Sequence, residues 1–465
     1  MRASERLTGR PLGVLLVLCG TIFLEGVDVA MLNVALPAIR ADLGVSTSML
    51  SGVVTAYVLG YGGFTLLGGR AADLLGRRRM FLFWLTVFLV FSGLGGFANE
   101  GWVLLVARFV TGVAAGFMTP AGLSLITTSF AEGRQRNKAL LVYAGTGAAG
   151  FALGLVIGGL LTAVGWRWVF FAPVILAAGI LLAAVVLIKE PAVPRPAGGR
   201  FDVPGAVTMT GGMMLLVYGV VRLEHPGEGW GWTVAAFAGA FALLAAFTAI
   251  ERRSADPLVR LGVFRSASLV RANVVATLLT ASFMGFQFLV TLYLQELRGW
   301  TPIQTGLALL IAAADVLLAP TLTPVLVNRY GNARVILGGL LSGVVAFAMF
   351  LGVGMDWTYA AMVPSMLLIG LMFAFVYGPV TIVATEGIAE HEQGLAGGLI
   401  TSSFQFGAAL GISMVTVVNV AALDGGASGI DAVRAALVVP VLATLVSVVV
   451  VASGLRRRTP VPVEA

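Results

Sequence analysis

The chain has 465 residues, of which 58% are hydrophobic and only 11% are charged, and its mean hydropathy is +0.98. Soluble globular chains carry about 25% charged residues, so this composition excludes a soluble protein and indicates a membrane protein. A formal net charge of +7 in a soluble chain would suggest a nucleic-acid partner. Here the basic residues fall in short gaps between apolar runs, where they would face lipid headgroups, so we expect a lipid bilayer and no nucleic acid as partner.

Fourteen segments are long and apolar enough to be predicted as transmembrane helices, which need about 20 apolar residues each. They cover residues 12–36, 47–69, 80–98, 102–129, 139–163, 168–188, 204–222, 231–250, 268–294, 303–327, 334–354, 358–385, 395–421 and 433–455.

The basic residues between these segments are distributed unevenly. Of the 29 Lys and Arg residues, 23 lie in alternate gaps, five lie in the other gaps, and Arg108 lies inside a segment. Cytoplasmic loops of membrane proteins carry the excess of Lys and Arg. The pattern therefore predicts a multi-pass protein of the cell (cytoplasmic) membrane with both termini in the cytoplasm.

Two Pro-rich and charged breaks, at 189–202 and 251–266, divide the segments into groups. We predict an N-terminal six-helix bundle over 1–190, a linker with two extra transmembrane helices over 191–266, and a C-terminal six-helix bundle over 267–465.

An internal echo supports this division. GRAADLLGRRR at 69–79 recurs in weaker form as LVNRYGNAR at 326–334, each between the second and third helices of its bundle. Duplicated six-helix halves are typical of transporters. No G-x-x-x-x-G-K-[ST] loop is present, so an ion gradient is a better candidate than ATP as the energy source.

Four ionisable residues lie deep inside the apolar segments: Glu25, Asp28, Arg108 and Asp315. Each costs at least about 2.5 kcal/mol at the middle of a membrane, so each is a functional-site candidate. Three buried acids and one buried arginine leave a net negative charge, which suits the binding of a cation or a proton.

Glu25 and Asp28 are three residues apart and share a face of the first helix. Two carboxylates this close in a low-dielectric environment should not both ionise easily, and a proton carrier needs that property. Asp28 and Arg108 lie nine and seven residues inward from the outer ends of their helices, at depths of about 13 and 10 Å. They could pair, and the alternative to a functional role is a static ion pair that holds two helices together.

Asp315 is expected near the middle of the segment at 303–327. It is a candidate for binding substrate charge or a second proton. The alternative is a hydrogen bond to a neighbouring Thr or Asn.

Three strings make the chain resemble the major facilitator superfamily, specifically its fourteen-helix drug:proton antiporter family. GRAADLLGRRR resembles the cytoplasmic motif of that family, VDVAMLNVALP at 27–37 resembles its helix-one string, and RFVTG at 108–112 resembles its helix-four motif. The first of these is carried by Gly69, Asp73, Gly76, Arg77 and Arg78.

The cytoplasmic motif implies a gate on the inner side of the membrane. A carboxylate at Asp73 could lie against the positive amino terminus of a helix in the other bundle, such as the one starting near Gly394. Arg77 and Arg78 could reach carboxylates or lipid phosphates. The alternative is that these charges only set the topology.

The helix-five antiporter motif is present as GFALGLVIGG at 150–159, in Gly150, Gly154, Gly158 and Gly159. Glycines at this spacing let another helix approach closely, which is also their simplest interpretation. Leu155 stands where the family has proline, so the helix should keep the packing and lose the kink that proline would cause.

The resemblance implies a secondary transporter that exports a small amphipathic or cationic compound by alternating access, with protons as the coupling ion and no other cofactor or metal. Asp28 with Glu25 would bind the proton, Arg108 would tune its affinity, and Asp315 would contribute to substrate charge or to a second proton. Several aromatic side chains could wall the cavity: Phe286, Tyr293, Phe373, Tyr377, Phe404 and Phe406. We expect a monomer that acts as a multidrug efflux antiporter in antibiotic resistance.

Three alternatives remain at this level. Because Leu155 replaces the proline of the motif, a proton-coupled importer or metabolite transporter of the same fold stays open. A membrane sensor or assembly subunit would share the architecture, but no soluble domain supports it. An enzyme is disfavoured because His225 and His391, the two histidines, lie in loops predicted on opposite sides of the membrane.

Overall fold

The computed structural model describes residues 9–130, 134–189, 202–222, 230–254, 261–386 and 393–455, together with 257 and 388. All regular secondary structure within these residues is helical. The helices are α1 (Arg10–Leu43), α2 (Thr47–Leu75), α3 (Arg77–Gly96), α4 (Gly101–Ser129), α5 (Arg134–Val164), α6 (Trp168–Leu187), α7 (Val203–Arg222), α8 (Trp230–Glu251), η2 (Leu261–Arg265), α9 (Ala267–Leu292), η3 (Tyr293–Leu297), α10 (Pro302–Leu309), η4 (Leu310–Ala313), α11 (Asp315–Tyr330), α12 (Asn332–Phe350), α13 (Tyr359–Thr385), α14 (Gln393–Asp424) and α15 (Gly429–Leu455).

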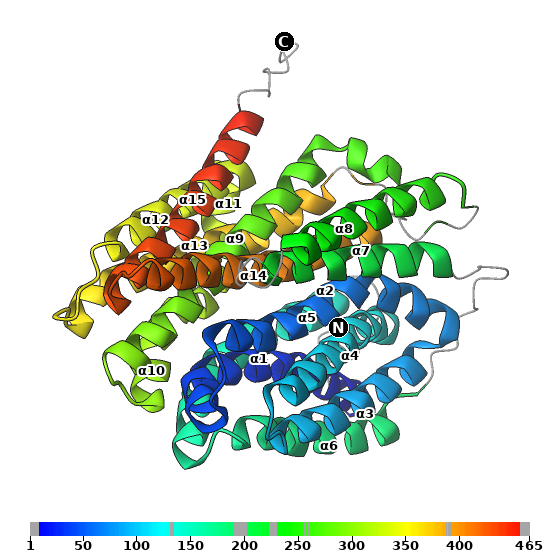
Figure 1. The fold of residues 1–465 in the computed structure, drawn as a ribbon. Coiled ribbons are helices and arrows are strands. Elements are labelled where there is room, and N and C mark those ends of the chain that lie inside the picture. Colours follow the sequence, from blue (N-terminus) through cyan, green and yellow to red (C-terminus); the bar gives the residue numbers. More distant parts are fainter. Residues whose placement is uncertain are drawn as a thin grey trace, which may run out of the picture. The chain divides into compact units, whose positions relative to one another are not determined.

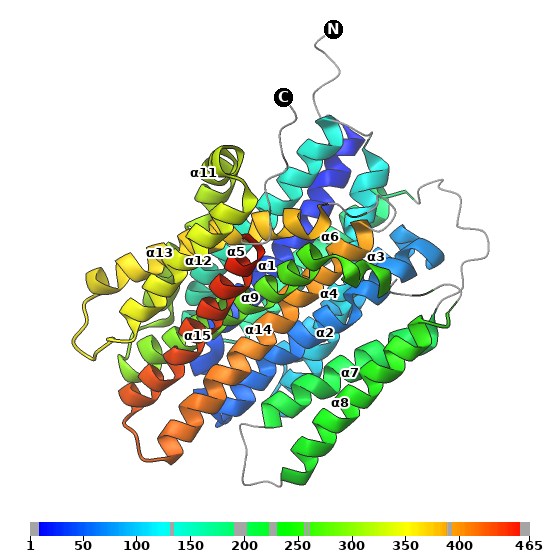
Figure 2. The same ribbon diagram turned by 90° about the horizontal axis from the view of Figure 1, so that it is seen from above.

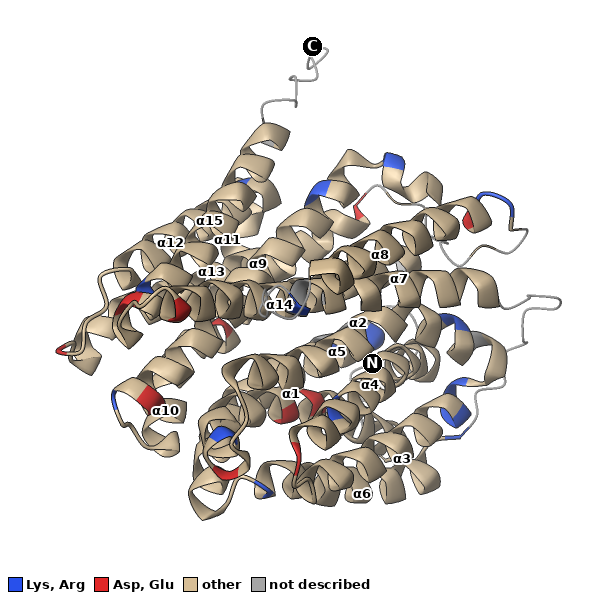
Figure 3. Cartoon of the chain, in the orientation of Figure 1, with Lys and Arg blue, Asp and Glu red and all other residues tan. Residues whose placement is uncertain are grey.

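Thirteen helical segments of the described chain are long and apolar enough to cross a membrane. They coincide with thirteen of the fourteen predicted segments. The remaining one, predicted over 204–222, is the helix α7. Charged residues gather at helix ends and loops, and most of the helix length carries none (Figure 3).

One predicted helix is interrupted. The segment expected to run unbroken over 303–327 consists of α10, the 3-10 turn η4 and α11, and Asp315 is the first residue of α11 rather than a mid-helix residue. Asp is a poor residue for a helix interior because its short carboxylate binds nearby backbone N–H groups. The same chemistry favours Asp at a helix start.

Several helix ends carry the local signals that the sequence provides. The Ser46 side chain accepts a hydrogen bond from Met49 N at 3.1 Å and caps α2. Thr301 and Gln304 form a capping box that starts α10. Gly44 ends α1 with a φ of 63°, and Gly76 joins α2 to α3 with a φ of 105°. These positive φ values favour glycine.

The chain divides into two compact units. Unit 1 contains 1–260 and 290–310, and unit 2 contains 261–289 and 311–465. Within unit 1, α2 packs along α4 and α1 along α5 (Figure 1). The pair α7 and α8 run side by side (Figure 2), and α7 packs on α2, where Thr210 Oγ donates to Gly63 O at 3.1 Å. The predicted boundaries at 190 and 266 stay a prediction.

Glycines make the α1–α5 contact possible. A Cβ at Gly150 would lie 2.6 Å from Phe23 O, and one at Gly158 would lie 2.6 Å from Met31 Cα. A Cβ at Gly154 would lie 2.8 Å from Ala30 Cβ. These distances leave no room for a side chain, so the two backbones meet directly. The helix-five motif therefore positions the part of α1 that carries Glu25 and Asp28.

Gly154→Leu should weaken this contact and destabilise the protein, by about 1–3 kcal/mol if the helices shift to relieve the overlap. Gly145→Leu is the matched control, because a Cβ at Gly145 on the same helix meets no atom within 4 Å. Thermal unfolding in detergent checks both variants. Equal unfolding temperatures would contradict the role given to Gly150, Gly154 and Gly158, which together form the glycine seam between α1 and α5.

Candidate functional site

A buried ion pair joins α1 to α4. Arg108 Nη1 donates to Asp28 Oδ2 at 2.6 Å, and the two side chains are 2% and 3% exposed. The Arg108 guanidinium also lies over the ring of Tyr57 on α2, at 4.3 Å from the ring centroid. The pairing predicted from the depths of Asp28 and Arg108 is confirmed.

Glu25 lies one turn from Asp28 and has different partners. Its Oε1 lies 2.7 Å from Thr119 Oγ, and its Oε2 lies 3.2 Å from the Tyr61 hydroxyl. These two hydroxyls are 2.9 Å apart, and Thr119 Oγ is also 2.9 Å from Ala115 O. Glu25 is only 5% exposed. A buried carboxyl group thus contacts two hydroxyl groups and has no ion pair among the described residues.

The hydroxyl partners of Glu25 are the residues that the sequence analysis missed. Tyr57 and Tyr61 are four residues apart on α2 and face the same side, with ring centroids 6.1 Å apart. Thr119 follows Arg108 by eleven residues, about three helical turns, so both lie on one face of α4. The sequence signal that could have identified them is the spacing of polar residues by whole helical turns along apolar helices.

In unit 2, Asp315 lies at the amino terminus of α11, where the helix dipole favours a negative charge. The alternative of a hydrogen bond to a neighbouring Thr or Asn is not found among the described residues, and Thr321 and Thr323 donate to backbone carbonyls.

Three of the predicted cavity aromatics form a row. The ring centroid of Tyr377 is 5.1 Å from that of Phe373 and 4.3 Å from that of Phe404, both at an interplanar angle of 19°. Phe283 on α9 extends the row next to Phe373 at 4.7 Å. Tyr377 is 43% exposed, so the row has an open side.

The other predicted aromatics lie elsewhere. Phe286 is buried between Phe347 and Phe350, at centroid distances of 5.4 and 4.9 Å. Tyr293 is fully buried, and its hydroxyl accepts a hydrogen bond from Arg298 at 2.8 Å. Phe406 is half-buried. Their function as cavity walls stays a prediction.

The cytoplasmic motif is anchored to α6 and α4. Arg78 donates to Ile188 O at 2.5 Å and to Val185 O at 2.9 Å, at the carboxyl end of α6. Arg77 donates to Ser124 O at 3.5 Å. Backbone carbonyls are thus among the partners of both arginines. The expected contacts with carboxylates or lipid phosphates stay a prediction. The expected contact of Asp73 with a helix near Gly394 lies outside the described side chains. Gly69 would place a Cβ 3.8 Å from Pro120.

The last part of the helix-five motif contacts α10. A Cβ at Gly159 would lie 2.7 Å from Pro302 O, and Gly306 lies directly against Leu155 O. Leu155 is fully buried, and α5 continues through it from 134 to 164. The glycines thus pack α5 on α1 and on α10, and the position that the family gives to proline is a regular helical residue.

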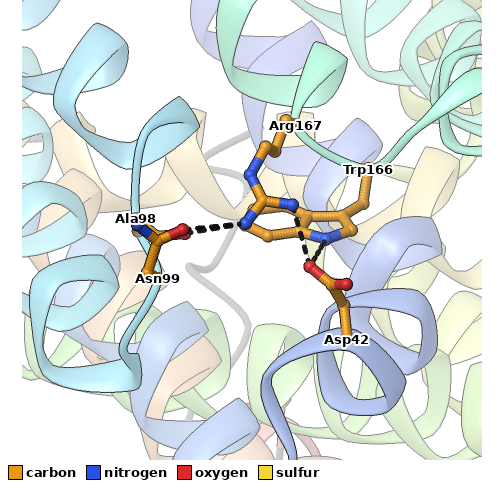
Figure 4. A network of polar contacts seen from close by, with 5 residues as sticks. All are labelled: Asp42, Ala98, Asn99, Trp166 and Arg167. Carbon is orange, nitrogen blue, oxygen red and sulfur yellow. Dashed lines mark hydrogen bonds and ion pairs between the residues drawn. The ribbon is translucent and has the colours of Figure 1, made fainter.

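Polar contacts fasten the end of unit 1 that carries the α1 carboxyl terminus. Asp42 Oδ2 accepts from Arg167 Nη1 at 2.8 Å and from Trp166 Nε1 at 2.9 Å, while Arg167 Nη2 donates to Ala98 O and Asn99 Oδ1 at 3.2 Å each (Figure 4). Two more contacts tie the 290–310 segment to α1. Arg40 Nη1 lies 2.8 Å from Glu296 Oε2, and Gln295 Nε2 donates to Val34 O at 2.9 Å.

The family model described as Major Facilitator Superfamily matches residues 18–412. The chain belongs to this superfamily. It is therefore a membrane transport protein and not an enzyme. The described helices give it the multi-pass, all-helical architecture of that fold.

Curated relatives are antibiotic resistance and export proteins. The chain is 35% identical to "Puromycin resistance protein pur8" of Streptomyces alboniger, over 88% of this chain and 82% of the relative. It is 32% identical to "Cephamycin export protein CmcT" of Amycolatopsis lactamdurans, over 88% and 85%. It is 33% identical to the "Lincomycin resistance protein" of Streptomyces lincolnensis, over 91% and 88%.

Solved structures share the fold at low identity. A POT family peptide transporter in complex with sulfate has a TM-score of 0.71 and 15% identity, covering 95% of this chain and 94% of that chain. A D-xylose-proton symporter has a TM-score of 0.65 and 16% identity, over 94% and 97%. These likenesses establish the architecture alone.

Removing one partner of the Asp28–Arg108 pair should cost about 3–5 kcal/mol, because it leaves an uncompensated buried charge. Asp28→Asn and Arg108→Gln should each lower the unfolding temperature strongly. The double variant should recover much of the loss because no unpaired charge remains. A double variant no more stable than either single variant would contradict the pairing, and thermal unfolding in detergent measures all three.

Proposed function

We propose that this transporter exports a small amphipathic or cationic compound of the antibiotic class from the cytoplasm in exchange for protons. The relatives named for puromycin, cephamycin and lincomycin support the substrate class. The observation that carries the coupling is the buried Glu25 carboxyl group with hydroxyl partners and no ion pair among the described residues. Alternating access of the two halves would expose this group to each side in turn.

Counting hydrogens favours a protonated Glu25 in this conformation. Four short contacts connect the Glu25 carboxyl group, the Tyr61 and Thr119 hydroxyls and Ala115 O. The two hydroxyls supply only two hydrogens, because each carries one O–H. A protonated carboxyl group supplies a third and can donate to Thr119 while Thr119 donates to Ala115 O. Glu25 is therefore our candidate for the proton site.

Asp28 has a different role in this proposal. Its charge is balanced by Arg108 at 2.6 Å, so it does not need a proton to remain buried. The pair fixes α1 against α4 one turn from Glu25. In this proposal the pair has a structural role, and proton exchange is left to Glu25.

Substrate binding belongs to unit 2 in this proposal. The row of Phe373, Tyr377 and Phe404 offers stacked ring faces, and a ring face attracts cations. Asp315, at the amino terminus of α11 in the same unit, would add a negative charge. The row fits a flat or cationic part of the substrate.

The orientation is also a proposal. Both termini lie in the cytoplasm, because 23 of the 29 basic residues fall on the side of the termini. We propose that the protein resides in the cytoplasmic membrane and acts as a monomer. The Arg40–Glu296 pair then lies on the outer side and helps to hold the 290–310 segment closed against α1.

Glu25→Gln should abolish proton-driven transport, because the amide cannot release a proton. In inverted vesicles of a host expressing the chain, an imposed proton gradient should drive puromycin accumulation with the native protein and not with this variant. Puromycin/puromycin exchange should survive in the variant, because exchange needs no net proton movement.

Asp28→Asn serves as the comparison and should affect stability more than coupling. Full gradient-driven accumulation in Glu25→Gln would remove Glu25 from the mechanism.

If puromycin is not a substrate, growth of an efflux-deficient host on lincomycin, a cephamycin or ethidium selects the compound. Proton movement in the same direction as the compound would indicate an importer.

Reversing one charge of the outer pair should weaken export. Arg40→Glu and Glu296→Arg each replace attraction by repulsion, and the double variant restores the pair in reversed order. The two side chains are 38% and 29% exposed, so the effect is limited to about 0.2–1 kcal/mol, or up to about fivefold in rate. Growth on the exported compound measures it, and a double variant as poor as the singles would contradict the pairing.

A further inference from the structure

An open groove lies between α1 and α6 on unit 1. Its volume is about 520 Å³, and its lining is apolar throughout. Leu16 and Ile175 line it and are 63% and 66% exposed. Because both helices are candidate membrane spans, we expect these side chains to face acyl chains rather than water.

The length of the groove corresponds to one leaflet of a bilayer. Along α6 its lining extends from Ile175 to Leu187, which is about 18 Å at about 1.5 Å per residue. Half of a hydrocarbon core of about 30 Å is about 15 Å. The groove begins where α6 ends, at the membrane surface on the side of the amino terminus.

Two guanidinium groups lie at this end of the groove. Arg10, one turn before the lining residue Gly13, donates through Nε and Nη2 to Leu187 O at 3.0 Å each. Arg78 donates to Val185 O and Ile188 O on the same helix end. Neither forms an ion pair with a carboxylate among the described side chains. Arg10 uses two of its five N–H groups on Leu187 O, and guanidinium N–H groups match the geometry of phosphate oxygens.

A missing side chain keeps the groove open. A Cβ at Gly179 would meet no atom within 4 Å, so a larger residue there would enter the groove without a clash. At Gly13 a Cβ would already touch Leu187 Cδ1 at 3.0 Å.

We propose that this groove binds one acyl chain of an anionic phospholipid of the inner leaflet, whose phosphate is bound by Arg10 with Arg78 beside it. The apolar groove selects the chain, and the guanidinium groups select the headgroup charge. Such a lipid bridges the amino-terminal turn of α1 and the carboxyl end of α6, and stabilises the helix that carries Glu25 and Asp28. The site is independent of the transported compound.

The test uses the full chain, purified in detergent and supplied with phosphatidylglycerol or with phosphatidylcholine of the same acyl chains. Phosphatidylglycerol should raise the unfolding temperature more than phosphatidylcholine, and native mass spectrometry should show it retained. Inorganic phosphate at the same concentration should have no effect on the unfolding temperature, because it lacks an acyl chain. Equal stabilisation by the two lipids, or stabilisation by inorganic phosphate, would overturn the proposal.

Two variants separate the contribution of the lipid headgroup from that of the acyl chain. Arg10→Gln should weaken phosphatidylglycerol binding about fivefold, the effect expected from one basic residue near an anionic headgroup. Gly179→Leu should fill the groove and reduce retention of the lipid while both arginines remain. If Arg10→Gln proves too unstable to purify, Gly179→Leu still decides the question.

Matched controls are Arg252→Gln, an exposed arginine at the end of α8, and Gly145→Leu, which is open but lies outside the groove. Both should bind phosphatidylglycerol as the native protein does. Full phosphatidylglycerol binding in Gly179→Leu would overturn the proposal.

Discussion

The cost of burying charge in a membrane determines the arrangement of unit 1. Arg108 and Asp28 remain charged inside the protein because each neutralises the other at 2.6 Å, and Glu25 remains there because two hydroxyls contact its oxygens. Removing Arg108 would leave the Asp28 carboxylate without a counter-charge, and removing the two hydroxyls would leave the buried Glu25 carboxyl group without a hydrogen-bond partner. The close approach of α1 to α4, and of α1 to α5 through the glycine seam, is what brings these groups together.

The same constraint separates two acids that look alike in the sequence. Glu25 and Asp28 share a helix face, but only Asp28 reaches the arginine. Asp28 therefore has a counter-charge in Arg108. Glu25 has none among the described residues, so the cost of burying it depends on whether its carboxyl group is protonated. This difference is the physical basis for assigning coupling to Glu25, and it also explains why a conservative change at either position should have different consequences.

Much of the fold could be predicted from the sequence, since hydropathy, basic residues and Pro-rich breaks each act locally. The Asp28–Arg108 pair was predictable too, because depth along a helix follows from residue count. Tyr61 and Thr119 were not recognised, since a hydroxyl on an apolar helix is inexpensive and carries little signal until its partner is known. The interruption before Asp315 escaped for a different reason: the run LLIAAAD is apolar enough for a continuous helix, and the low preference of a single Asp for helix interiors is a weak signal.

The path of the chain between 290 and 310 restricts how the molecule can change shape. This short segment is part of unit 1, although the residues before and after it are part of unit 2. Its α-helical geometry is replaced by a π-helix at 293–297 and by 3-10 geometry at 310–313, near the two points of crossing. Weaker or irregular backbone bonding makes such turns easier to rewind than an α-helix. The chain passes between the units near these two turns and once more at 260/261. A reorientation of the units would therefore bend the backbone more readily at the two irregular turns than within an α-helix.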